Sequence, residues 1–380
     1  MSRAVHLYLI AGEASGDQVG ARLMQALRTK AHVRFSGIGG PCMESQGLRS
    51  LFPMSDLSVM GIFEVLPHIP RLLKRLQETE RDILEQRPDV VVTIDAPGFN
   101  FRLAKRLKKQ GIPIIHYTAP TVWAWRPGRA RKVARFLSHL LTLFPFEPPY
   151  FEKEGLPTTF VGHPLVEMDI GPQRKKSFRQ RFGYAQTQPL LCLLPGSRQK
   201  EVDSLLPLFL NAVDILKSRL PDLEILLPVV PHLESAVCAH LKESSLSSFR
   251  IISDPQEKIA AMAASDVALA ASGTVALELA LTETPMVIAY KMNPLTAWVV
   301  RRLLLTRYAC LVNILLNESI VPELLQENCT VGKIVESVLV EMQGSQREHL
   351  KKIRPLISPV SGTPSDIAAA QILKVKDIKI

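Results

Sequence analysis

Residues 190–198 read Leu-Leu-Cys-Leu-Leu-Pro-Gly-Ser-Arg: an apolar run ends in a turn, and a helical pattern from about Lys200 to Arg219 follows. A buried strand that passes through a glycine turn into a helix is typical of a parallel βαβ unit. Gly196 lets a phosphate approach the main chain, Ser197 can cap the helix, and Arg198 offers a forked donor. The GK[ST] ending of a Walker sequence is missing. We predict a diphosphate site here; the alternative is a capped helix with a surface arginine.

Short apolar runs alternate with amphipathic ones along the rest of the chain, which predicts an α/β protein with parallel sheets. Its 380 residues exceed the usual size of one core. Breaks rich in Pro and Gly divide the chain into residues 1–165, 166–353 and a linker with a final helix, 354–380. We therefore predict two doubly wound domains with a ligand cleft at the carboxyl ends of their strands.

The predicted strands of the first half are Val5–Ala11, Val33–Ile38, Val90–Ile94, Ile112–Tyr117, Leu140–Phe144 and Thr159–Val161. Those of the second half are Leu190–Leu194, Leu223–Leu227, Phe249–Ile252, Val267–Ala270, Met286–Ala289 and Ala309–Val312.

Composition and charge narrow the class of protein. Hydrophobic residues make up 47% and charged residues 22%, which is ordinary for a globular chain. The five cysteines are scattered without CxxC spacing, which favours a reducing compartment over a disulfide framework. No apolar run is long enough to span a membrane. Residues 1–165 carry 22 Lys+Arg against 14 Asp+Glu, a net of +8, whereas the remainder carries +2. This basic half suits nucleic acid, anionic lipid or a phosphorylated substrate.

Two features of the first half place polar groups at strand ends. Gly12-Glu13-Ala14-Ser15-Gly16-Asp17 follows the first predicted strand, so its N–H groups can face an anion or a sugar hydroxyl. It is not GxGxxG, which argues against a dinucleotide site. Asp95 ends the run 90–94 and is placed to take a proton from a hydroxyl nucleophile, unless it only caps the next helix. His116, at the end of the neighbouring strand, is a rival base or a core histidine.

A further helix start in the second half matches the first. Ser272-Gly273-Thr274 opens a helix after a strand of small residues, and Glu278 lies one turn later, where it could accept from a ribose diol. The alternative for Glu278 is a routine partner of the helix dipole. Neither a DxD sequence nor a His cluster is present, so the sequence demands no divalent metal.

Two apolar segments of the first half suggest contact with a sugar or a membrane. Trp123-Ala124-Trp125-Arg126 offers indole faces beside a cation, although core packing is an equal alternative. Residues 60–76 are apolar with basic residues interleaved, which fits a segment at an anionic interface as well as an ordinary amphipathic helix. The predicted membrane-facing side chains are Met60, Phe63, Val65, Leu66, Ile69, Leu72 and Leu73.

In order and spacing, these motifs together resemble the lipid-A-disaccharide synthase family over nearly the whole chain. The matching stretches are Ala11–Asp17, Gly39–Pro41, Val59–Gly61, Ile94–Pro97, His116–Tyr117, Val122–Arg126, Gly162–Pro164, Leu194–Arg198 and Ser272–Thr274 with Glu278. The resemblance implies the GT-B fold, with residues 1–165 binding the acceptor and facing the membrane and 166–353 binding the UDP-sugar. The last helix would return to the first domain of its own or a partner chain.

The activity that the resemblance implies is transfer of 2,3-diacylglucosamine from UDP to the 6-hydroxyl of 2,3-diacylglucosamine 1-phosphate, with inversion and without a metal or other cofactor. Asp95 would be the general base, and Glu278 and Asn313 would hold the nucleoside. Glu13, Ser15, Gly16, His116, Trp123, Trp125 and Arg126 would line the sugar side. It further implies a cytoplasmic enzyme, peripheral on the anionic inner membrane, which dimerises by exchanging C-terminal segments.

One position departs from the family pattern, which often has an Asp where this chain has Gly98. Asp95 is therefore the only carboxylate at this turn. Two alternatives remain open at this stage: a UDP-N-acetylglucosamine 2-epimerase, which shares the fold, and a non-catalytic nucleic-acid-binding module that uses the basic half. The clustering of Trp123 and Trp125 beside one turn disfavours the module.

Overall fold

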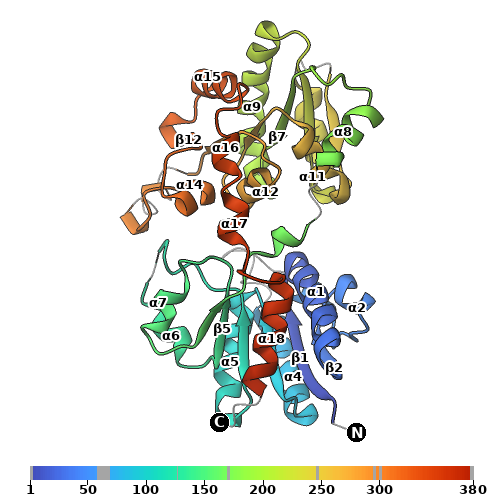
Figure 1. Cartoon of the computed structure of the whole chain (residues 1–380), viewed down its shortest axis with the longest axis vertical. Coiled ribbons are helices and arrows are strands. Elements are labelled where there is room, and N and C mark those ends of the chain that lie inside the picture. The colour runs from blue at the N-terminus through green and yellow to red at the C-terminus, as the bar shows by residue number, and fades with distance from the viewer. Residues whose placement is uncertain are drawn as a thin grey trace. The chain divides into compact units, whose positions relative to one another are not determined.

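The computed structural model describes residues 3–57, 69–125, 127–168, 172–244, 248–293, 297–298 and 302–376. The chain forms two compact units (Figure 1). Unit 1 comprises Met1–Glu167 with Ile357–Ile380, and unit 2 comprises Met168–Leu356. Among the described residues, no helix is both long and apolar enough to cross a membrane.

Unit 1 is built on a parallel sheet of six strands in the order β2-β1-β3-β4-β5-β6. The strands are β1 (Val5–Ala11), β2 (Val33–Ile38), β3 (Val90–Ile94), β4 (Ile114–Tyr117), β5 (His139–Thr142) and β6 (Thr158–Phe160). The helices are α1 (Ala14–Lys30), α2 (Pro41–Ser45), α4 (Ile69–Gln86), α5 (Pro97–Leu107), α6 (Arg129–Ala134), α7 (Pro148–Glu152) and α18 (Pro364–Lys376).

Alternation along the strands of unit 1 fills two apolar layers. Leu7 and Leu9 of β1 pack with α1 and α18 on one face, whereas Tyr8 and Ile10 pack with α4 and α5 on the other. Successive side chains of a strand point to opposite faces, so continuous apolar strands need helices on both. The final helix α18, drawn in red in Figure 1, lies beside α1. Its Ala369 and Ile372 are fully buried in that layer.

Unit 2 has a second parallel sheet, in the order β12-β11-β10-β7-β8-β9. The strands are β7 (Leu190–Leu194), β8 (Glu224–Pro228), β9 (Arg250–Ile252), β10 (Val267–Ala270), β11 (Met286–Tyr290) and β12 (Glu323–Leu325). The helices are α8 (Pro172–Arg181), α9 (Gln199–Arg219), α10 (Glu234–Lys242), α11 (Pro255–Ala264), α12 (Val275–Leu281), α14 (Leu311–Leu316), α15 (Val331–Glu341), α16 (Arg347–Leu350) and α17 (Ile353–Ile357). Counted from its first strand, this is the 3-2-1-4-5-6 order of a Rossmann fold.

Each sheet reverses its strand order beside its first strand. In unit 1 the reversal lies at the carboxyl ends of β1 and β3, and in unit 2 at those of β7 and β10. Open α/β sheets bind ligands at such a switch point. The turns that carry Asp95 and Arg198 therefore both lie where the topology favours a site.

The prediction of a strand at Ala309–Val312 is wrong, because the sixth strand of unit 2 is β12. The backbone N–H groups of Ala309 and Cys310 donate to the carboxylate of Glu323, at 2.8 and 3.1 Å. With these donors taken by a side chain, the apolar run enters helix α14 instead of a sheet. A short apolar run alone does not distinguish the two outcomes.

Candidate active site

Asp95 lies at the carboxyl end of β3, on a turn with unusual backbone geometry. Asp95 has a φ of 51° and Ala96 a φ of 39°, so two consecutive residues other than glycine are left-handed. Such a conformation is strained and persists only where the surroundings enforce it. The amide of Asn100, buried in the first turns of α5, donates to the carbonyl oxygen of Asp95 at 2.8 Å and holds the turn.

The carboxylate of Asp95 is turned toward the start of α1. Its Oδ1 accepts the N–H of Gly12 at 3.0 Å. A Cβ added to Gly16 would lie 1.9 Å from Oδ2, so a side chain there would collide with the carboxylate. Burial and then the charge of Glu13 raise the pKa of Asp95 to about 7, although the Gly12 N–H opposes the shift. A carboxyl with a pKa near neutrality is poised to accept a proton at physiological pH.

Glu13 and Ser15 lie where β1 passes into α1. Helix α1 begins at Ala14, with Glu13 at its N-cap, so Ser15 and Gly16 belong to its first turn. Ser15 is exposed and Glu13 half-buried. The turn thus brings Glu13, Gly16 and Asp95 together and leaves Ser15 available to a ligand.

His116 is buried in unit 1, in agreement with the alternative of a core histidine. Its Nδ1 lies 2.7 Å from the hydroxyl of Thr93, and its ring packs edge-on against Phe101 with 4.6 Å between ring centroids. Burial lowers the pKa of His116 to about 3. Only 1% of the residue is exposed, so it offers no surface to a sugar.

The two tryptophans of the 123–126 motif have different surroundings. Trp123 is 7% exposed, and its Nε1–H donates to Glu147 at 3.1 Å. Its ring packs edge-on against Phe144 and Phe146, which is the core-packing alternative. Burial raises the pKa of Glu147 to about 7. Trp125 is 37% exposed, and its Nε1–H donates to the hydroxyl of Thr121 at 3.4 Å. Arg126 lies outside the described residues.

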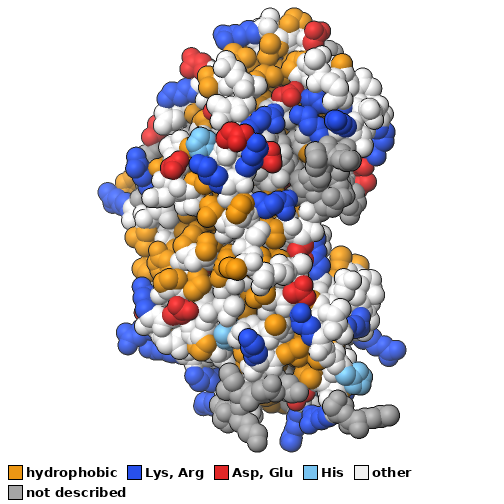
Figure 2. Space-filling view, in the orientation of Figure 1, with side chains coloured by type: hydrophobic (Ala, Val, Ile, Leu, Met, Phe, Trp, Pro, Cys, Tyr) orange, Lys and Arg blue, Asp and Glu red, His pale blue; other side chains and the backbone are white. Residues whose placement is uncertain are grey.

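The predicted membrane-facing segment is described only from Ile69 onward, on α4; Met60, Phe63, Val65 and Leu66 lie outside the described residues. Ile69 and Leu73 are 37% and 43% exposed. Leu72 packs partly against the core of unit 1. Figure 2 shows Lys and Arg side chains along the α5 and α6 side of the same unit.

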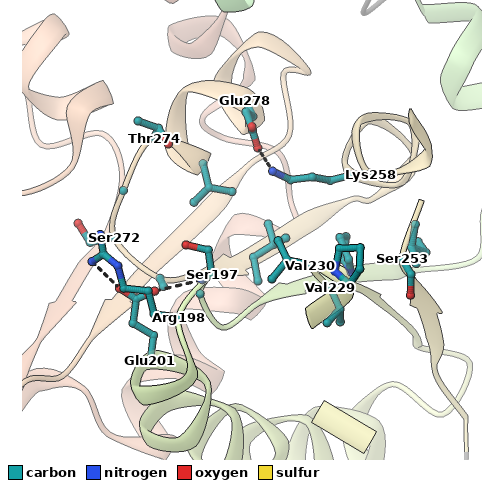
Figure 3. A pocket seen from close by; sticks show the side chains of 18 of the residues that line it. Ser197, Arg198, Glu201, Val229, Val230, Ser253, Lys258, Ser272, Thr274 and Glu278 are labelled. Carbon is teal, nitrogen blue, oxygen red and sulfur yellow. Dashed lines mark hydrogen bonds and ion pairs between the residues drawn. The ribbon is translucent and has the colours of Figure 1, made fainter. Parts of the chain in front are cut away.

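Unit 2 contains a cavity of about 490 Å³ at its switch point. The turns after β7 and β10 line it, together with the chain after β8 and after β9 and residues of the helices α9, α11 and α12 (Figure 3). The predicted residues that line the cavity are Gly196, Ser197, Arg198, Ser272, Gly273, Thr274 and Glu278. Sequence analysis missed Glu201, Val229, Val230, Ser253 and Lys258, which also line it.

At the β7–α9 turn a carboxylate of the chain occupies the position expected for an anion. Glu201 Oε2 accepts the N–H of Ser197 at 3.1 Å, and its Oε1 lies 3.4 Å from the guanidinium of Arg198 (Figure 3). Gly196 has a φ of 129°, and a Cβ there would lie 2.5 Å from Glu201. The side chain of Arg198 is 66% exposed. The N–H, the guanidinium and the glycine therefore form an anion site that a ligand phosphate can take over from Glu201.

Glu278 also has an internal partner. Its Oε2 lies 2.5 Å from Nζ of Lys258, which reaches across from α11 (Figure 3). Glu278 lies in the first turn of α12, and its side chain is 17% exposed. No sequence motif marks Lys258 as a residue of this site, because only the fold places α11 beside α12.

Asn313 does not line this cavity. Its amide donates to Val321 O and Glu323 at 2.8 Å each, and its Oδ1 accepts the N–H groups of Ile320 and Val321 at 3.0 and 2.8 Å. It is fully buried. These four bonds fill its hydrogen-bonding capacity in this structure, so the role of its side chain toward a nucleoside stays a prediction. Asn313 orders the chain between α14 and β12.

The architecture and the two switch-point turns together define a GT-B type α/β protein, with one unit presenting a buried carboxylate and the other an open anion site. Among solved structures, the UDP-GlcNAc 2-epimerase from Neisseria meningitidis bound to UDP-GlcNAc matches with a TM-score of 0.65 and 13% identity, over 98% of this chain and 100% of that one. MurG of Acinetobacter baumannii matches with a TM-score of 0.58 and 14% identity, over 97% and 99%. At these identities the likeness concerns the fold.

Sequence relatives decide the family. The family model described as lipid-A-disaccharide synthetase matches residues 7–358. The lipid-A-disaccharide synthase of Rhodospirillum centenum is 49% identical over 97% of this chain and 94% of its own length. That of Gluconobacter oxydans is 42% identical over 97% and 90%. The chain belongs to the lipid-A-disaccharide synthase family and is a glycosyltransferase of lipid A biosynthesis.

Proposed function

We propose that this chain transfers 2,3-diacylglucosamine from its UDP derivative to the 6-hydroxyl of 2,3-diacylglucosamine 1-phosphate. The products would be the β-1,6-linked disaccharide 1-phosphate and UDP. The observation that carries the proposal is the buried carboxylate of Asp95, with a pKa near 7, at the switch point of a family member. A sugar hydroxyl needs such a base, and the remaining chemistry needs only a stabilised leaving group.

The proposed reaction is a single displacement with inversion. Oxygen O6 of the acceptor attacks the anomeric carbon, and Asp95 takes the hydroxyl proton. The bond from the anomeric carbon to the β-phosphate oxygen breaks, and its electron pair leaves with UDP. Gly12 donates to Oδ1 of Asp95, while Oδ2 makes no hydrogen bond to any described residue, which leaves this oxygen for the proton.

On the donor side, the diphosphate would take the place of the Glu201 carboxylate. It would accept from the Ser197 N–H and the Arg198 guanidinium at the N-terminus of α9. The carboxylate of Glu278 would give up its ion pair with Lys258 and accept hydrogen bonds from the ribose diol. The positive groups of this turn support a metal-independent reaction, since they can neutralise the departing charge. A rate unchanged by EDTA is the expected outcome.

The acceptor and the membrane belong to unit 1 in this proposal. Ser15, Trp125 and the basic side chains over α5 and α6 would receive the phosphorylated acceptor. The segment that continues into α4 would touch the cytoplasmic face of the anionic inner membrane, where acylated substrates partition. A homodimer by exchange of C-terminal segments is also proposed: α18 packs on α1 through buried apolar side chains and the ion pair of Lys30 with Asp366 at 3.1 Å, and the same contacts could form with α1 of a second chain.

The decisive experiment mixes purified protein with both acylated sugars in detergent and detects the disaccharide and UDP by mass. Formation of both, and their loss in the Asp95→Asn variant, is the expected result. Interconversion of UDP-N-acetylglucosamine without disaccharide would favour the epimerase alternative instead. Crosslinking of cysteines placed in α1 and α18 tests the exchange, because it links two chains only in an exchanged dimer.

A further inference from the structure

A patch of exposed apolar side chains lies in unit 2. Trp298 is 53% exposed, and Leu303, Leu304 and Leu305 are 45%, 38% and 62% exposed. We call these residues, with Arg302 and Arg307, the 298–307 patch. Four large exposed hydrophobics in one short segment are more than the scattered apolar residues of an ordinary surface.

The charged residues of the segment that carries the patch are all basic. Residues 284–317 contain Lys291, Arg301, Arg302 and Arg307 and neither Asp nor Glu. The guanidinium carbon of Arg302 lies 3.7 Å from the ring centroid of Trp298. A tryptophan stacked with an arginine, beside leucines, is the combination that inserts at an anionic bilayer surface, where the ring reaches the headgroup level.

The place of the patch in the fold ties it to the nucleotide cavity. It follows β11, which runs parallel to β10, and β10 runs parallel to β7. The chain after Tyr290 therefore leaves the sheet from the same edge as the two anion-site turns. The hydroxyl of Tyr290 lies 3.5 Å from Glu201 Oε1, at the rim of the cavity. At the far end of the segment, the bonds from Ala309 and Cys310 to Glu323 anchor it.

We propose that the 298–307 patch is a membrane-binding surface of unit 2 that inserts into an anionic bilayer. This inference deepens the proposed function and rests on it for the reason why the surface exists. A donor with two acyl chains resides in the bilayer, and its UDP group must reach the cavity. A membrane contact in the segment that leaves the sheet beside the cavity would hold unit 2 at the bilayer, so that the acyl chains of the donor need not leave the lipid.

The test measures binding of the full chain to vesicles of phosphatidylglycerol and phosphatidylethanolamine by flotation. A Trp298→Ser, Leu305→Ser double variant is expected to bind at least tenfold more weakly, because both apolar anchors are lost. Arg302→Gln and Arg307→Gln are each expected to weaken binding about fivefold, which corresponds to about 1 kcal/mol per cation at such a surface. Vesicles of phosphatidylcholine alone should show little effect of either arginine.

Matched controls lie on α9 and α15 of the same unit. Val340→Ser removes a side chain that is 56% exposed, and Arg219→Gln removes an exposed cation. Both are expected to bind vesicles like the unmodified chain. Thermal unfolding and UDP affinity of every variant show whether unit 2 is intact, since none of the substituted residues lines the cavity.

A second measurement follows Trp298 itself. The difference in emission between the unmodified chain and Trp298→Phe should shift to the blue with anionic vesicles and be quenched by brominated acyl chains. Unchanged vesicle binding in the double variant, or absence of quenching, overturns the inference. A change in the oligomeric state of the double variant, measured by light scattering, also overturns the inference, because it would assign the patch to contact with a second copy of the chain. Disaccharide synthesis in detergent micelles tests the proposed function separately, because dispersed substrates need no bilayer contact.

Discussion

The strand-to-helix turns that follow β1 and β7 share one arrangement, in which a backbone N–H of the turn is hydrogen-bonded to a carboxylate. The two carboxylates differ in their surroundings. In unit 1 the N–H of Gly12 donates to the carboxylate of Asp95, and in unit 2 the N–H of Ser197 donates to that of Glu201. Asp95 is buried with a raised pKa and held by a strained turn. Glu201 lies beside the exposed Arg198. The same turn geometry therefore binds a buried carboxylate in one unit and, in the other, a carboxylate whose partner Arg198 is exposed to solvent.

The largest effect is expected when the carboxylate of Asp95 is removed. Asp95→Asn is expected to lower kcat about 10²- to 10⁴-fold, the usual contribution of a general base, with little change in UDP affinity. Steady-state kinetics and calorimetric UDP titration measure the two effects. An equal loss of UDP affinity would contradict the division of labour between the turns.

Gly16→Ala tests how the carboxylate is positioned. The new Cβ would lie 1.9 Å from Asp95 Oδ2, so the carboxylate or α1 must move. We expect kcat to fall about a hundredfold, since a displacement of about 1 Å has that cost in other enzymes. Gly98→Ala is the matched control, because nothing lies within 4 Å of a Cβ there. Similar kinetics for the two variants would remove the positioning role.

Arg198→Ala tests the ligand turn. Loss of a charge-assisted bond is worth about 1.5–3 kcal/mol, so UDP should bind about 10- to 100-fold more weakly. Arg198→Lys should recover only part of the affinity, because an ammonium cannot donate as a fork. Calorimetry against UDP and uridine separates the effect, since uridine, which lacks the diphosphate, should be insensitive to both changes.

The pH profile sharpens the comparison for unit 1. The pKa of Asp95 is about 7 in the folded chain against an ordinary value of 3.8, so the folded chain binds the additional proton between these values. Activity should therefore rise with pH through about 7, being about tenfold lower at pH 6 than at its plateau. The stability of the fold changes in the opposite direction to the activity: the contribution of Asp95 to the free energy of unfolding is present below about pH 4 and is lost as the pH rises to about 7.

The unmodified chain carries a buried charge on Asp95 at pH 8, so Asp95→Asn should have a higher melting temperature than the unmodified chain at that pH. At pH 4 the two melting temperatures should differ less. Glu147, whose pKa is also about 7, contributes with the same sign, so the variant should retain part of the pH dependence. Melting temperatures at both pH values check the prediction. A lower melting temperature of the variant at pH 8 would contradict the buried-charge explanation.

The smallest effect is expected for Glu201→Gln. Glutamine keeps an acceptor for the Ser197 N–H but no longer competes for Arg198 with a charge. UDP should bind about three- to fivefold more tightly, as expected for loss of a competing ion pair with the exposed Arg198 that is worth up to about 1 kcal/mol. Asp203→Asn, an exposed charge on the same helix, is the control. Weaker UDP binding in Glu201→Gln would assign Glu201 a positive role in the site.

Strands, helices and the two principal turns were predictable because their signals are local. The apolar run 190–194 and the glycine turn after it read directly as β7 and the start of α9. Lys258, Glu201 and Glu147 were not predictable as site or core partners, since each acts through a neighbour that only tertiary packing provides. The internal hydrogen bonds of Asn313 with the chain between α14 and β12 were not predictable for a related reason, since the sequence does not show which partners an amide finds.

The final helix has a consequence for how the protein is made. Unit 1 takes a wall of its core from α18, whose Ala368, Ala369 and Ile372 are fully buried beside α1. These residues leave the ribosome after all of unit 2. Domains usually fold as units during synthesis, in N-terminal order. Here the first domain to emerge is completed last, so during translation its α1 face stays uncovered and depends on unit 2 being made without error.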